Sequence, residues 1–127
     1  MGIKTQRPKY LNLFQIRQAV TAVVSIAHRI SGVILFLVLP IAMYGFALSL
    51  RSAPDYAAVQ KILHHPGMQV LWLLLAWAGL HHFFAGLRFL LLDMDIGLRL
   101  QTARATAWLV FVLTGVGLLV LITRWQA

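Results

Sequence analysis

"MQVLWLLLAWAGLHHFFAGLRFLLL", residues 68–92, is an almost continuous apolar stretch, and it decides the fold. A helix needs about 20 such residues to cross the hydrocarbon core of a bilayer, so the stretch predicts a membrane-spanning helix. It nevertheless carries His81, His82 and Arg88. Ionisable side chains at membrane depth are costly and usually serve a function, which makes these three residues candidates for a site.

The chain contains two further stretches of this kind, at residues 30–50 and 105–123, and 61% of its 127 residues are hydrophobic. We expect helices in all three, because a helix satisfies its own backbone polar groups in lipid. Pro40 should kink the first helix without ending it. Residues 12–29 are less apolar and predict a helix at the membrane interface. The predicted fold is therefore all-α: an integral membrane protein with three transmembrane helices plus an N-terminal interfacial helix, as a single domain over residues 1–127.

The segments between the predicted spans are short connections. Residues 51–67 contain prolines, a glycine and charged groups and are expected at the surface, with a helical turn around residues 56–63. Residues 93–104 join the second and third spans. Three helices bury few of their faces against one another, so we expect a second membrane subunit to complete the bundle.

The charge of the chain is strongly one-sided. Eleven Lys and Arg residues stand against three acidic residues, which gives a net charge of +8. Because the basic residues lie between apolar stretches, contact with anionic lipid head groups is favoured and nucleic acid is not expected as a partner. The sequence has no cysteine, which excludes disulfides, thiolate metal sites and iron–sulfur ligands in this chain.

The basic residues also predict the orientation in the membrane, because cytoplasmic loops carry an excess of Lys and Arg. The N-terminus lacks the features of a cleaved secretory signal, so we expect a multi-pass protein of the bacterial inner membrane. Its N-terminus should be cytoplasmic and its C-terminus periplasmic. On the predicted cytoplasmic side lie Lys4, Arg7, Lys9, Arg17, Arg29, Arg88, Arg99 and Arg104, against Arg51, Lys61 and Arg124 on the other side.

A first group of polar residues lies in TAVVSIAHRISG, residues 21–32. On a helix, Ser25 lies on one face with His28 and Arg29, at spacings of three and four residues. His28 and Arg29 can simply reach up to lipid phosphates. Alternatively, the three side chains form a polar pocket for a lipid-soluble ligand, in which the serine hydroxyl donates to a carbonyl oxygen and Arg29 holds an anionic group.

The second group is the histidine pair. His82 lies about 15 Å from the Asp93 end of its helix at the helical rise, where an imidazole without a polar partner costs several kcal/mol. Either it bonds to a neighbouring helix, or one of its nitrogens is a haem axial ligand while the other is oriented by a second acceptor. Gly79 and Gly86 share the face of His82 and would let a flat macrocycle approach, which favours His82 over His81 without deciding between them.

Two motifs then resemble a known family. The run QRPKYLNLFQIRQAVTAVVSIAHRISG, residues 6–32, and HFFAGLRFLLLD, residues 82–93, are similar to those of the cytochrome b membrane-anchor subunit of succinate dehydrogenase, respiratory complex II. The family's second motif reads H-x-x-x-G-x-R-H-x-x-x-D. The three-span layout agrees as well, so the resemblance covers nearly the whole chain.

The resemblance implies roles for individual residues. His82 matches the family's haem axial ligand, and Ser25 and Arg29 match positions that line the ubiquinone site. His28 and Arg29 match positions near the haem propionates. Asp93 matches an acidic residue associated with the quinone site or its proton supply.

One position departs from the family pattern. Phe89 stands where the family often has a histidine, which puts in doubt any propionate contact or proton relay through that imidazole. Arg88 is then expected to carry more of the propionate charge.

The family also implies a cofactor, partners and a reaction. The complex contains a flavoprotein subunit, an iron–sulfur subunit and two membrane anchors that share one haem b. Electrons from succinate oxidation on the flavoprotein pass to ubiquinone, in the tricarboxylic acid cycle and the respiratory chain. This chain would be a non-flavin subunit of the enzyme with no catalytic residue for succinate oxidation. The alternatives are an anchor of a fumarate reductase or another quinone-linked dehydrogenase, and a haem-free membrane transport or scaffold protein.

Overall fold

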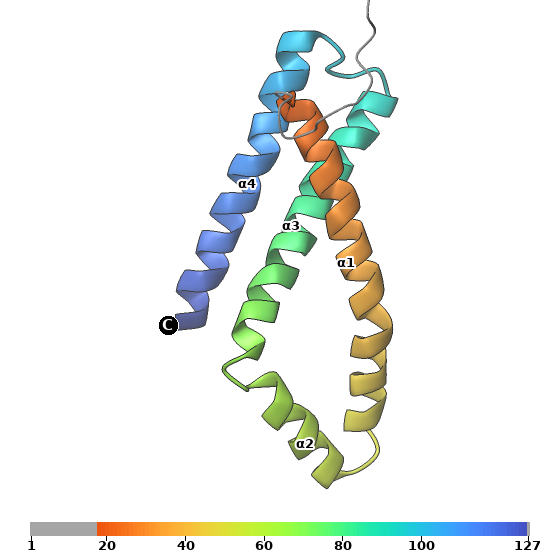
Figure 1. Ribbon diagram of the computed structural model, residues 1–127, viewed down its shortest axis with the longest axis vertical. Coiled ribbons are helices and arrows are strands. Elements are labelled where there is room, and N and C mark those ends of the chain that lie inside the picture. The colour runs from red at the N-terminus through yellow and green to blue at the C-terminus, as the bar shows by residue number, and fades with distance from the viewer. Residues whose placement is uncertain (1–17, 127) are drawn as a thin grey trace, which may run out of the picture.

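The computed structural model describes residues 18–126, and within them all of the secondary-structure elements are helices. The four helices are α1 (Val20–Ser49), α2 (Ala53–Leu63), α3 (Met68–Asp93) and α4 (Leu100–Gln126). Three of them, α1, α3 and α4, are long and apolar enough to cross a membrane. Figure 1 shows these three running along one another, with α2 closing the end where α1 and α3 are joined. The all-α membrane bundle predicted from the sequence is confirmed.

The second and third spans lie where the sequence placed them, but the first differs. α1 begins at Val20, so residues 20–29 are the first turns of the spanning helix and not a separate interfacial helix. The contact of this segment with α3 explains the difference, because the His28 ring stacks on His82 of α3. Residues 12–17 of the predicted interfacial helix lie outside the described residues.

The prediction that Pro40 does not end the first helix is confirmed, since α1 continues to Ser49. The connection after it folds into α2, which is longer than the single turn expected. Ser52 caps α2, accepting a bond from the Asp55 backbone N–H at 3.2 Å. At its other end the indole of Trp72 in α3 donates to the Leu63 carbonyl at 3.3 Å, which ties α2 to the start of α3.

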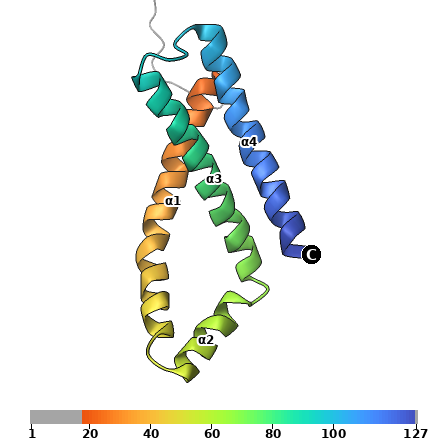
Figure 2. The same cartoon turned by 180° about the vertical axis from the view of Figure 1, so that it is seen from behind.

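The core of the bundle is made of small side chains. Ala78, Ala85 and Ala107 are fully buried, together with Val24, and such residues let helix backbones approach closely in a membrane. α3 packs against both α1 and α4, and Figure 2 shows the same arrangement from behind. Large side chains such as Phe36 in α1 remain exposed on the outside, where lipid or another membrane chain would cover them.

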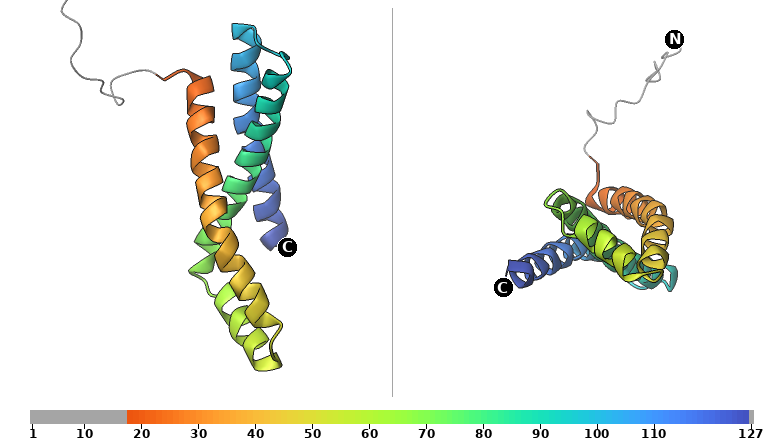
Figure 3. Two further views of the ribbon diagram at one scale, coloured as in Figure 1. Left: turned by 90° about the vertical axis from the view of Figure 1, so that its right-hand side faces the viewer. Right: turned by 90° about the horizontal axis from the view of Figure 1, so that it is seen from below.

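The topology brings three helix ends together. The start of α1, the end of α3 and the start of α4 lie at one end of the molecule, and α2 lies at the other (Figures 1 and 3). The turn between α3 and α4 includes Gly97 at φ 86°, a conformation that glycine adopts without strain. Polar residues near these three ends can therefore act at a common membrane surface.

Candidate functional site

The side chain of His82, on α3, is held against α1 through its Nδ1 atom. This nitrogen lies 3.1 Å from the His28 backbone carbonyl oxygen and 3.3 Å from Ser31 Oγ. The ring lies against Gly32, where a Cβ atom would come within 2.9 Å of His82 Cε1. Only glycine leaves room for the imidazole at this point of α1.

These contacts select one form of the ring. Ser31 Oγ lies 2.8 Å from the same His28 carbonyl oxygen and donates its hydrogen to it. A carbonyl oxygen can only accept, and the serine hydroxyl has already used its single hydrogen. The short distances at Nδ1 therefore require a hydrogen on Nδ1, and the tautomer that can bind a metal is the one with Nδ1–H and a free Nε2. The lone pair of His82 is then on Nε2, which is available to another partner.

His28 completes the group by stacking on His82. The two ring centroids are 4.2 Å apart and the ring planes differ by 8°. His28 also covers Gly86, where a Cβ would lie 3.4 Å from its Nε2 atom. Of the two glycines predicted to flank His82, Gly86 is thus in contact with the His28 ring. The space beside Gly79 is open, because a Cβ added there would meet no heavy atom within 4 Å.

His81 has a different environment from His82. It is fully buried and lies between Trp77 and Phe111, with ring centroids 5.7 and 5.5 Å away. Neither ring nitrogen has a hydrogen-bond partner within the part of the chain that the structure describes. The aromatic rings enclose His81 in the bundle interior, so between the two histidines it is His82 whose second nitrogen is oriented by polar groups.

Arg88 is directed at α4 and not at His28 and Arg29. Its Nε donates to Thr106 Oγ1 at 3.1 Å and its Nη2 to the Ala103 carbonyl at 3.2 Å, and the residue is 6% exposed. The structure therefore does not group Arg88 with the other two residues predicted to contact haem propionates. These bonds instead fasten the end of α3 to the start of α4.

The remaining predicted residues lie toward the end of the molecule where three helix ends meet. Ser25 is partly buried and Arg29 is exposed, one turn apart on α1. Asp93 is the last residue of α3 and is exposed. Phe89, at the position where the family often has histidine, packs beside His28 with a centroid distance of 5.1 Å. An imidazole at that position would thus have faced His28.

Two residues of the site received no role from the sequence. Ser31 is fully buried and bonds to both His28 and His82, and Gly32 makes room for the His82 ring. The signal in the sequence was the spacing, since Ser31 follows His28 by three residues and so lies on the same helix face. What the spacing could not give was the register of α1 against α3.

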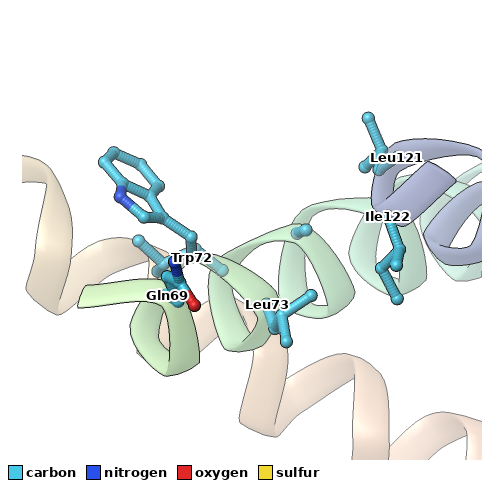
Figure 4. A pocket seen from close by; sticks show the side chains of 7 residues that line it. Gln69, Trp72, Leu73, Leu121 and Ile122 are labelled. Atoms are coloured by element: carbon cyan, nitrogen blue, oxygen red, sulfur yellow. The ribbon is translucent and has the colours of Figure 1, made fainter. Parts of the chain in front are cut away.

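A groove lies at the other end of the bundle. It has a volume of about 580 Å³ and opens between the beginning of α3 and the end of α4 (Figure 4). Trp72, on the wall of the groove, lies about 15 Å from His82 along α3 at the helical rise. None of the predicted site residues lines the groove. The groove is formed by Gln69, Trp72, Leu73, Leu75, Ala76, Leu121 and Ile122.

Comparison with known proteins agrees with this architecture. Residues 4–123 match the family described as succinate dehydrogenase/fumarate reductase transmembrane subunit. The chain is also 34% identical over 114 residues to the succinate dehydrogenase cytochrome b556 subunit of Coxiella burnetii (strain RSA 493 / Nine Mile phase I), an alignment that covers 88% of this chain and 90% of that protein. A match over nearly the whole length, on a bundle of three membrane-spanning helices, shows that the chain belongs to the succinate dehydrogenase/fumarate reductase transmembrane subunit family.

Proposed function

We propose that this chain is the cytochrome b anchor of a succinate:ubiquinone oxidoreductase, in which it co-ligates haem b through His82 and helps to form the ubiquinone site. The observation that carries the proposal is the position of His82. Its Nδ1 is held by the His28 carbonyl and Ser31, and its Nε2 carries the lone pair. A ligating histidine almost always donates its other ring N–H in this way.

The residues around His82 fit a haem. The chain provides one oriented imidazole, that of His82, whose Nδ1 is held by α1. One axial ligand from this chain and one from a second anchor subunit agree with that donor set. When bound, the haem would supply one-electron storage beside the route to quinone.

His28 and Arg29 would hold the haem propionates from α1. Stacking places His28 against the face of the His82 ring, and Arg29 follows His28 directly in the sequence. Arg88 would also contribute positive charge toward the propionates, because its bonds to α4 use only two of its five N–H groups. These bonds in addition fix α4 to α3, the helix that carries His82.

Ser25 and Arg29 would bind the ubiquinone head group at the surface of the membrane. A serine hydroxyl can donate to one carbonyl oxygen of the quinone, and a guanidinium stabilises the negative charge that develops there during reduction. The exposed carboxylate of Asp93, at the same end of the molecule, would supply protons from the aqueous side.

The orientation and partners follow from the same proposal. The end of the bundle that contains Ser25, Arg29 and Asp93 would face the cytoplasm of a bacterium, where the flavoprotein and iron–sulfur subunits deliver electrons. The exposed apolar side chains of α1 would meet the second anchor subunit and lipid. A fumarate reductase anchor is the alternative within the same family, with electrons moving in the opposite direction.

Purification of the complex through a tag on this chain tests the proposal. We expect a flavoprotein, an iron–sulfur protein and a second membrane chain to co-purify, and a dithionite-reduced minus oxidised spectrum to show a b-type haem. The purified complex should reduce ubiquinone with succinate. A complex of the expected subunits without haem absorbance would refute the ligand role, and the absence of those subunits would refute the assignment as their anchor.

A further inference from the structure

We propose that Ser31 is a positioning residue that, together with the His28 carbonyl, holds the haem-ligand form of His82 and tunes the electron donation of its Nε2 atom. The inference rests on the proposed function, because it concerns how the chain prepares His82 for iron. It adds a residue to which neither the sequence motif nor the family resemblance gave a role.

The first step is the placement of the hydroxyl. Ser31 is fully buried and its Oγ lies within bonding distance of both the His28 carbonyl oxygen, at 2.8 Å, and His82 Nδ1, at 3.3 Å. His82 Nδ1 lies 3.1 Å from that carbonyl. The three polar atoms form a closed triangle between α1 and α3, and Ser31 Oγ contacts both of the other atoms.

The second step is the direction of the bonds. Because Ser31 donates to the His28 carbonyl, its lone pairs face His82 and can accept from Nδ1–H. The Nδ1–H group therefore has two acceptors. Hydrogen-bond acceptors on the non-ligating nitrogen fix the tautomer and raise the basicity of the ligand, which would favour the oxidised state of a bound iron.

The third step is the restricted position of the ring. Gly32 and the stacked His28 limit movement of the His82 imidazole on two sides. A ring that cannot shift cannot replace a lost acceptor by moving to a new one. Removal of the Ser31 hydroxyl should thus change the midpoint potential and the EPR signal of a bound iron, because the ring cannot move to a new acceptor.

The test is the midpoint potential of the haem in the assembled complex, with its low-spin EPR signal as a second readout. We expect Ser31→Ala to keep haem at the wild-type ratio to flavin, to move the potential in the positive direction and to broaden the EPR signal. Ser31→Thr keeps the hydroxyl and should restore both properties, whereas the nearly isosteric Ser31→Val should not. The Thr and Val variants decide the question if the Ala variant fails to assemble.

Ser49 provides the matched control. It lies on the same helix, and its Oγ donates to the Phe46 carbonyl at 2.7 Å, a bond of the same kind at the far end from His82. Ser49→Ala should leave the potential unchanged. A wild-type or negatively shifted potential in both Ser31→Ala and Ser31→Val overturns the inference, while a haem that persists without His82 would overturn the proposed function instead.

Discussion

Replacement of His82 by alanine is expected to abolish the Soret and α bands of the purified complex. The variant loses the imidazole whose Nε2 carries the lone pair, and no other side chain of α3 on that face can take its place. The measurement is the haem-to-flavin ratio from absorbance and pyridine haemochrome analysis, which should fall from the wild-type value to near zero.

His81→Phe is the control for this prediction. The substitution removes both nitrogens of the neighbouring histidine but keeps an aromatic ring between Trp77 and Phe111. It should retain haem at the wild-type ratio, because the His81 ring is enclosed by aromatic side chains in the bundle interior. Low-spin haem in His82→Ala, or its loss in an assembled His81→Phe complex, would reverse the assignment of the two histidines.

Replacement of Arg29 by alanine should lower succinate:ubiquinone reductase activity by about 100- to 1,000-fold, the range for loss of one preorganised donor to a developing oxyanion. Succinate oxidation with a soluble dye that accepts electrons from the flavoprotein should continue at the wild-type rate. The ratio of the two rates in purified complex is the measurement, because it separates quinone reduction from assembly.

Arg124→Ala serves as the comparison for Arg29→Ala. Arg124 is also exposed, but it lies in the last turn of α4, at the end of that helix away from Arg29. It should leave both rates unchanged. If Arg29→Ala also leaves quinone kinetics unaltered, the polar residues of α1 do not form the quinone site. Arg29 then only reaches up to lipid phosphates, which was the alternative that the sequence left open.

Much of the fold followed from the apolar stretches alone. Length and composition predicted three spanning helices, and the continuation of the first through Pro40 was correct as well. The start of α1 was misplaced because polar residues such as Ser25, His28 and Arg29 lower the hydropathy of its first turns. His28 is accommodated there because its ring stacks on His82 of α3, and such a tertiary contact cannot be read from a single stretch of sequence.

The site was predictable to the level of helix faces and no further. Spacing grouped His28 with Ser25 and Arg29, and the structure adds that His28 meets His82 across the helix interface. Spacing could not show that Arg88 turns toward Thr106, because that depends on where α4 returns. The role of Ser31 also depends on the register of two helices, which local sequence does not encode.

The central claim is that His82 is kept deep in the bundle as an iron ligand, with its other nitrogen fixed by α1. A structure of the assembled complex that resolves the haem tests this claim most directly. We expect His82 Nε2 to be bonded to the iron while Nδ1 remains hydrogen-bonded to the His28 carbonyl and Ser31. An iron held by other residues, with His82 bonded only to protein groups, would contradict it.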